Sequence, residues 1–186
     1  MKLLGIVGSL RADSYNAKLM REAQRLLPAG IELELYDGLR DVPAYDEDLE
    51  AGEQPAVEAL KAAIAEADAV LFATPEYNGS IPGQLKNALD WVSRPFEHNP
   101  LRNKPVAVIS ASTGMFGAVW ASAELRKVLG LIGARAVDRD TPVVVAEGAG
   151  GEADRLTGPE SVEALEAVLA DLAELVRERE ALHAAA

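Results

Sequence analysis

The chain has 186 residues and no cysteine, and its 30 acidic and 18 basic residues give a formal net charge of −12. This length suggests one domain, spanning residues 1–186, that can bury a core without disulfides or metals. The lack of cysteine excludes disulfides, thiol catalysis and thiolate metal sites. The acidic balance argues against nucleic-acid and anionic-membrane partners, because both need a basic surface.

Neither a metal site nor a membrane span is expected. The two histidines, His98 and His183, lie far apart, and the acidic group at Asp46, Glu47 and Asp48 matches no recognisable ligand pattern. The apolar run near the N-terminus is too short for a signal peptide, and nowhere do 18 consecutive apolar residues occur. The sequence therefore predicts a cytoplasmic protein.

Short apolar segments alternate along the chain with longer segments of helical periodicity. Most of the apolar segments predict strands buried on both faces, but the alternation of Glu32 and Glu34 with apolar residues predicts a strand near the sheet edge. The predicted strands are residues 3–7, 31–36, 69–74, 105–110 and 142–146, and the predicted helices are 14–27, 55–67, 82–92, 120–132 and 160–182. This order indicates an α/β protein with a parallel sheet covered by helices on both faces.

The first loop with unusual residues, 8–16, joins the first strand to the first helix. In such a sheet, ligands bind beyond the carboxyl ends of the strands. Gly8 permits a tight turn, a helix start offers unpaired N–H groups to an anion, and Ser9, Ser14 and Asn16 add neutral donors. Arg11 adds a fork-shaped cation suited to a phosphate. A serine-capped helix with a surface arginine is the alternative.

The second loop, 74–83, follows the third predicted strand. Two prolines and two glycines shape its backbone, Tyr77 offers an aromatic ring, and Asn78 offers both a donor and an acceptor. This combination suits a flat ligand with a polar edge. A rigid turn with no ligand is the alternative.

The third loop, 110–118, carries small hydroxyl residues and two glycines that let the backbone approach a ligand. Met115 and Phe116 in the same loop are equally consistent with packing. Glycine-rich turns are frequent, so this loop by itself favours neither interpretation.

Together the loops carry a family resemblance. G-S-L-R-x-x-S-x-N at residues 8–16, followed by P-E-Y-N-G-S-I-P-G-x-L-K-N-A-x-D-W at 75–91, resembles the NAD(P)H-dependent FMN reductase family of flavodoxin-like quinone and azo-dye reductases. The resemblance covers roughly residues 2–180. It implies a flavodoxin-like three-layer fold whose five-stranded parallel sheet has the order 2-1-3-4-5.

The resemblance also implies FMN as the cofactor and NADPH or NADH as the co-substrate. It assigns Ser9, Arg11, Ser14 and Asn16 to the FMN phosphate. Pro75, Glu76, Tyr77 and Asn78 would line the isoalloxazine ring, and Ser112 and Gly114 would close the other side. The complete set of expected cofactor-binding residues is Ser9, Arg11, Ser14, Tyr15, Asn16, Pro75, Glu76, Tyr77, Asn78, Gly79, Ser112, Thr113 and Gly114.

Two positions depart from the family pattern. Phe116-Gly117-Ala118 stands where relatives commonly have paired glycines, and Asp13 places a negative charge inside the phosphate loop.

No catalytic acid–base pair is expected, because a flavin carries the hydride chemistry itself.

A small-molecule acceptor (a quinone, azo dye, flavin or oxidised metal) would take the hydride in ping-pong fashion. Trp91 and Phe96 near the second loop, together with the family's habit, suggest a homodimer or homotetramer. A flavodoxin-type electron carrier is the main alternative. A receiver-type signalling domain is disfavoured, because Gly8-Ser9 and Thr74-Pro75 stand where it needs acidic residues.

Overall fold

The computed structural model describes residues 1–112, 118–139, 144–145 and 159–184. Its main sheet is parallel and has the strand order β2-β1-β3-β4-β6. The strands of this sheet are β1 (Lys2–Val7), β2 (Glu32–Tyr36), β3 (Ala69–Ala73), β4 (Pro105–Ile109) and β6 (Arg135–Ala136). The flavodoxin-like architecture implied by the sequence is thus confirmed.

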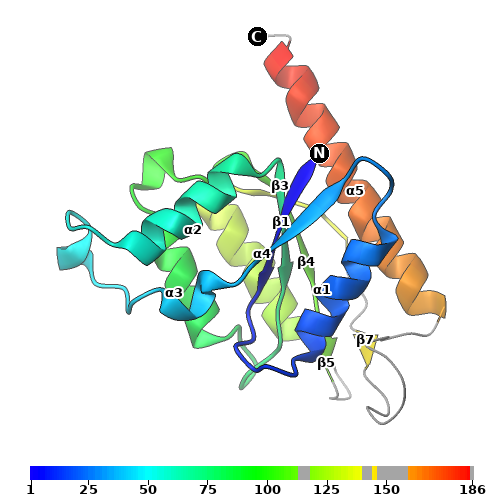
Figure 1. Ribbon diagram of the computed structural model, residues 1–186, viewed down its shortest axis with the longest axis horizontal. Coiled ribbons are helices and arrows are strands. Elements are labelled where there is room, and N and C mark those ends of the chain that lie inside the picture. Colours follow the sequence, from blue (N-terminus) through cyan, green and yellow to red (C-terminus); the bar gives the residue numbers. More distant parts are fainter. Residues whose placement is uncertain (113–117, 140–143, 146–158, 185–186) are drawn as a thin grey trace.

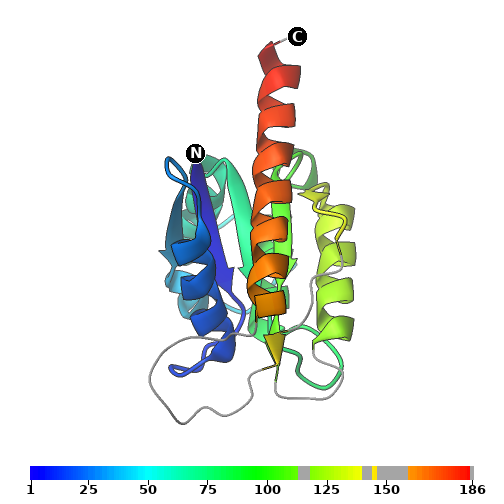
Figure 2. The ribbon, with the colours of Figure 1, turned by 90° about the vertical axis from the view of Figure 1, so that its right-hand side faces the viewer.

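Five long helices form the outer layers. These are α1 (Tyr15–Leu26), α2 (Pro55–Glu66), α3 (Gly83–Val92), α4 (Val119–Ile132) and α5 (Pro159–Ala184). Short 3-10 turns occupy Gly38–Asp41, Glu47–Leu49 and Phe96–His98. Helices α1 and α5 cover one face of the sheet, and α2, α3 and α4 cover the other (Figures 1 and 2).

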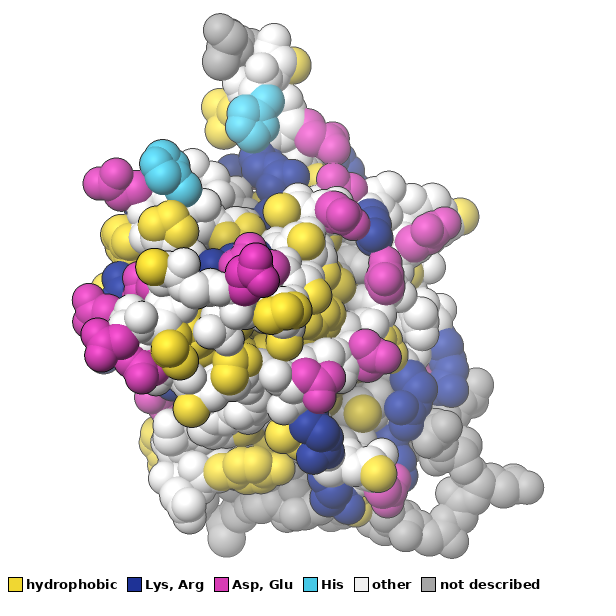
Figure 3. Space-filling view, turned by 60° about the vertical axis from the view of Figure 1, so that its left-hand side comes forward, with side chains coloured by type: hydrophobic (Ala, Val, Ile, Leu, Met, Phe, Trp, Pro, Cys, Tyr) yellow, Lys and Arg dark blue, Asp and Glu magenta, His cyan; other side chains and the backbone are white. Residues whose placement is uncertain are grey.

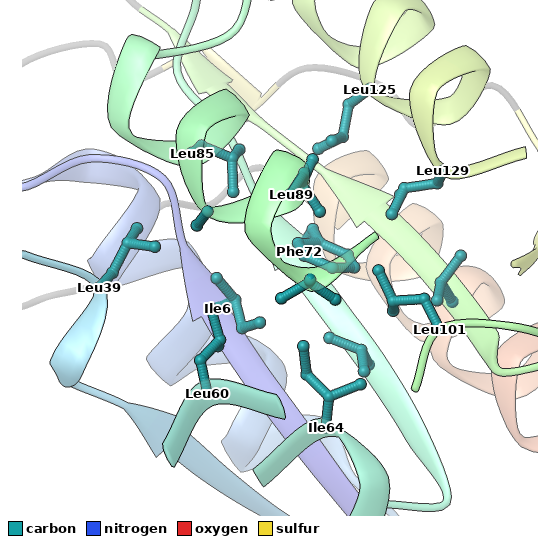
Figure 4. Close-up of a cluster of buried hydrophobic side chains, with 14 of the residues drawn as sticks. Ile6, Leu39, Leu60, Ile64, Phe72, Leu85, Leu89, Leu101, Leu125 and Leu129 are labelled. Atoms are coloured by element: carbon teal, nitrogen blue, oxygen red, sulfur yellow. The ribbon is translucent and has the colours of Figure 1, made fainter. Parts of the chain in front are cut away.

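Alternate residues of each central strand enter different cores. Ile6 and Phe72 pack with α2, α3 and α4, as the close-up in Figure 4 shows for Leu60, Leu85 and Leu125. Leu3 and Leu71, one position out of phase, pack with α1 and α5. Because side chains alternate across a strand, a strand buried on both faces must be apolar at every position. This explains the continuous apolar runs in the sequence.

The edge strand is also as predicted. Strand β2 lies at one end of the sheet, and Glu32, Glu34 and Leu35 are exposed while Leu33 is buried. Glu32 and Glu34 place one face of the strand in water, as their alternation with apolar residues predicted, and Leu35 is exposed as well at this edge.

The placement of the fifth strand was wrong. The sequence predicted residues 142–146, but the strand beside β4 in the main sheet is β6, at Arg135–Ala136. The described part of the predicted segment, β7 (Val144–Val145), pairs instead with β5 (Ala111–Ser112), which follows β4 after Ser110. The two-residue β6 has no apolar run of its own, so periodicity could not reveal it.

Helix α5 extends past the end of the sheet, and its last turns stand clear of the body (Figures 1 and 2). None of the helices in the described part of the chain combines the length and the hydropathy that a membrane span requires.

Candidate functional site

The carboxyl ends of β1, β3 and β4 meet at one edge of the sheet. The ladder continues by one bond beyond each strand pair: Gly8 N donates to Ala73 O at 2.8 Å, and Thr74 N donates to Ile109 O at 3.0 Å. The three loops singled out in the sequence therefore begin side by side.

A cavity of about 170 Å³ opens between these loops. Nine of its ten lining residues belong to the predicted cofactor-binding set, and Ala111 is the tenth. The lining residues are Ser9, Arg11, Ser14, Tyr15, Asn16, Pro75, Glu76, Tyr77, Ala111 and Ser112. Residues more than 60 positions apart in the sequence thus share one site.

The first loop presents the start of helix α1 to this cavity. Ser14 is the buried N-cap, and its Oγ accepts from Ala17 N at 3.4 Å. The N–H groups of Tyr15 and Asn16, one position and two positions into the helix, have no acceptor within it. Such N–H groups, together with the positive end of the helix dipole, suit an anion. Gly8 sets the loop close to α3, because a Cβ there would come within 2.9 Å of Leu85 Cδ2.

Two cations flank the ring of Tyr15. The Arg11 guanidinium lies 5.4 Å from the ring centroid, and the Lys18 ammonium lies 5.7 Å from it. Lys18 also pairs with Asp13 at 2.7 Å. The hydrogen bond and charge of Lys18, with smaller contributions from Arg11 and Arg21, lower the pKa of the Asp13 carboxyl. Asp13 therefore stays ionised, and the Lys18 ammonium offsets its negative charge.

Asn16 ties the first loop to the third. Its Nδ2 donates to Ala111 O at 3.0 Å, and its Oδ1 accepts from Ala111 N at 2.9 Å. Asn16 is 2 % exposed. The structure thus shows Asn16 in a pair of buried hydrogen bonds between the start of α1 and β5, and its assignment to the phosphate stays a prediction.

The second loop contains a tight hairpin. Tyr77 and Ser80 exchange backbone hydrogen bonds of 2.9 and 3.2 Å around Asn78 and Gly79. These two residues have φ of 55° and 76°, which are the left-handed values of a type I′ turn and explain the Asn-Gly pair. Asn78 and Gly79 lie exposed at the tip and do not line the cavity.

Tyr77 faces the first loop across the cavity. Its hydroxyl lies 3.4 Å from Ser9 Oγ, and the residue is about half exposed. An aromatic side chain thus stands beside the anion-binding start of α1.

Two carboxylates join the second loop to helix α4. Glu76 Oε2 accepts from Trp120 N at 3.1 Å and from Ala121 N at 3.2 Å. Ser80 Oγ donates to Glu124 Oε2 at 2.6 Å. Nothing in the motif signalled these contacts, because they cross from one loop to a helix more than 40 residues away.

Two of the predicted site residues, Thr113 and Gly114, lie outside the described residues. Sequence reasoning missed Lys18 and Ala111. Lys18 follows Tyr15 by one helical turn, so helical spacing could have found it. Ala111 contributes its backbone, which leaves no trace in residue type.

The distribution of charge matches this arrangement. Acidic side chains are spread over the face in Figure 3, and the largest group of Lys and Arg side chains lies in its lower right part. Arg11, Lys18 and Arg21 thus lie close to Asp13 at the first loop of a protein whose net charge is −12.

A flavodoxin-like sheet whose carboxyl edge sets a helix start and an arginine beside an aromatic wall defines a class of protein. It is a protein that binds a cofactor with a phosphate at one end and a flat ring at the other. The donor set fits FMN, because the start of α1 and Arg11 suit a phosphate, and Pro75 and Tyr77 suit a flat ring.

The comparisons with known proteins agree. The chain belongs to the NADPH-dependent FMN reductase family, whose model matches residues 1–149. It is thus an oxidoreductase of a family that uses FMN as cofactor and NAD(P)H as co-substrate.

Among its relatives, an NAD(P)H-dependent FMN reductase of Pseudomonas aeruginosa is 51% identical over 130 residues, which are 69% of each chain. A quinone reductase of Escherichia coli is 38% identical over 141 residues, 75% of this chain and 74% of that one. The flavoenzyme NAD(P)H:(acceptor) oxidoreductase FerB of Paracoccus denitrificans is 35% identical, with a TM-score of 0.85 over 95% of this chain and 97% of that one.

Proposed function

We propose that this chain is a one-domain enzyme that binds one FMN at the carboxyl edge of its sheet and passes a hydride from NAD(P)H to a small-molecule acceptor. The observation that carries the proposal is the cavity itself, in which the helix start with Arg11 lies opposite Pro75, Glu76 and Tyr77. The family supports the cofactor and the co-substrate.

In this proposal, the side chains and backbone N–H groups of the protein bind the cofactor and orient its ring. The N–H groups at the start of α1, Ser9 and the Arg11 guanidinium would hold the phosphate, and Pro75 to Tyr77 would form the wall of the ring. Bound FMN supplies the hydride chemistry. No protein acid or base is required beside it, and the carboxylate of Glu76 is occupied by the backbone of α4.

We propose a flat acceptor such as a quinone, an azo dye or a free flavin. Tyr77 is half exposed beside the cavity, so an aromatic face is available at its mouth. Relatives named quinone reductase support this class of acceptor.

NAD(P)H and the acceptor would then use the same mouth in turn. This order predicts parallel lines in a double-reciprocal plot of NADPH oxidation at several quinone concentrations. Intersecting lines would contradict it. Steady NADPH consumption with a quinone, beyond one equivalent per chain, also separates an enzyme from a one-electron carrier.

We also propose that the chain self-associates as a homodimer or homotetramer. Trp91, one of the two residues that suggested this from the sequence, is 2 % exposed and donates from Nε1 to Pro43 O, so it belongs to the core. Phe96 is 46% exposed, and Trp120 and Leu131 on α4 are 53% and 68% exposed. Large exposed apolar side chains are typical of interfaces. Sedimentation at micromolar concentration tests this, and a pure monomer would contradict it. The cytoplasmic location stays a prediction from the sequence.

A further inference from the structure

The second loop of the cavity is fastened to helix α4 from two directions. Glu76 of the loop accepts from two backbone N–H groups at the start of α4, and Glu124 of α4 accepts from Ser80 of the loop. Tyr77 lies between these fastenings, and its backbone bonds to Ser80 close the hairpin. The segment that would line the ring is therefore held at both ends by one helix.

Glu76 does for α4 what an N-cap residue ordinarily does. The residue at the N-cap position is Ala118, which has no side-chain acceptor. Trp120 and Ala121 are the second and third residues of the helix, the positions whose N–H groups an N-cap side chain satisfies. Glu76 supplies that oxygen from 44 residues away, and its negative charge complements the positive end of the helix dipole.

We propose that Glu76 is a positioning residue for the cofactor: by capping α4, its carboxylate fixes Pro75 and Tyr77 at the distance from the first loop that the flavin ring requires. This inference rests on the proposed function. Pro75, Glu76 and Tyr77 are consecutive and all line the cavity, so loss of the Glu76 bonds to α4 would release the backbone that carries both neighbours. Tyr77 is the residue that faces Ser9, so the width of the cavity depends on this loop.

The experiment compares FMN and riboflavin, which share the ring and differ in the phosphate. Fluorescence titration of the apoprotein gives both dissociation constants for the wild type and for Glu76→Ala, Glu76→Gln and Ser80→Ala. Glu97→Ala is the matched control, because Glu97 is an exposed carboxylate in the Phe96–His98 turn and is not among the residues that line the cavity. Thermal unfolding of each apoprotein shows whether it is folded.

Glu76→Ala is expected to weaken FMN and riboflavin by the same factor, about five- to tenfold, because the ring wall is common to both. Glu76→Gln is expected to restore most of the affinity, since the amide oxygen still accepts from α4. Ser80→Ala is expected to show a smaller loss of the same kind, and Glu97→Ala no loss.

Unchanged affinities in a folded Glu76→Ala protein of lowered melting temperature would overturn the proposal and leave Glu76 as a stabilising cap only. A loss confined to FMN would also overturn it, because the phosphate and not the ring would then be the group affected. Wild-type protein that binds neither flavin would instead overturn the proposed function itself.

Discussion

The two loops that face each other across the cavity are built on different principles. The first, around Ser14 and Asn16, is fixed by buried neutral hydrogen bonds and leaves the charge of Arg11 exposed toward solvent. The second, around Tyr77, uses its charged residue Glu76 to fix its own position and leaves an aromatic ring exposed. In the first loop, neutral hydrogen bonds hold the backbone and a charged side chain is exposed. In the second loop, a charged side chain holds the backbone and an aromatic ring is exposed.

Asn16→Ala should have the largest effect on stability, because it removes the two neutral hydrogen bonds that hold the first loop to Ala111. The buried N–H and C=O of Ala111 both lose their partner. An unsatisfied buried group costs about 1–3 kcal/mol, so the free energy of unfolding should fall by about 3 kcal/mol. Urea unfolding measures this. Gln24→Ala on the same helix, which removes a single bond to Leu33 O, should cost about 1 kcal/mol, and an equal loss in both would contradict the role of Asn16.

Arg11→Ala should remove the exposed charge of the first loop and leave the hydrogen bonds of Asn16 to Ala111 intact. A charge-assisted hydrogen bond contributes roughly 1.5–3 kcal/mol, so FMN affinity should fall about 10- to 100-fold while riboflavin affinity stays unchanged. Fluorescence titration measures both. Arg177→Ala, an exposed arginine on α5, is the control. Unchanged FMN affinity would make Arg11 a surface residue, which was the alternative interpretation of the sequence.

The opposite edge of the sheet extends the comparison, because a charged side chain is buried there as well. Lys104 is 7 % exposed, and its Nζ donates to Ala65 O and Ala67 O near the end of α2. Burial, with a smaller effect of Arg179, lowers the pKa of Lys104 from 10.5 to about 8. The unfolded chain therefore binds this proton more tightly than the folded protein, and Lys104 becomes less destabilising as the pH rises from 8 toward 10.5.

Between pH 7 and pH 10, the stability of the wild type should accordingly rise by about 2 kcal/mol relative to Lys104→Met. Urea unfolding at both pH values measures the difference. Lys127→Met, on the exposed surface of α4, provides the control. A difference between wild type and Lys104→Met that is constant with pH would contradict the assignment.

Substitutions of Asn78 test whether the second loop depends on the backbone conformation of this residue or on contacts of its side chain. The expected effect, on the rate of flavin reduction, is the smallest of those predicted here. The φ of 55° at Asn78 costs alanine about 1–2 kcal/mol but costs glycine nothing. Asn78→Ala should therefore slow the bleaching of flavin absorbance by NADPH in stopped flow by about fivefold, even at saturating FMN, and Asn78→Gly should restore it. If Asn78→Gly is as slow as Asn78→Ala, the amide itself contacts the cofactor or the co-substrate.

The sequence predicted what depends on local pattern. The strands β1, β3 and β4 are continuous apolar runs, and the loops after them carry the residues that line the cavity. It misplaced the fifth strand, because the pairing of β6 with β4 is decided by the packing of the whole sheet and not by the two residues Arg135 and Ala136. Local apolar character at 142–146 was a correct sign of extended backbone at Val144–Val145 but not of its neighbour.

The same limit explains the site. The residue types of Asn16 and Glu76 showed that an amide and a carboxylate lie in the loops predicted to bind the ligand. They could not show that Asn16 bonds a backbone 95 residues away, or that Glu76 caps a helix it does not belong to. Polar side chains near a ligand divide between holding the ligand and holding the loop, and only the fold decides which.

The long reach of α5 has a practical consequence. This helix carries the C-terminal end of the described chain past the sheet on the side away from the cavity, and β1 begins on that same side (Figure 1). A linker joined after Ala184 would therefore lead away from the edge that carries the cavity. Attached to a bead or an electrode through that end, the protein would stand with its cavity turned outward, and the protruding turns of α5 would act as a built-in spacer.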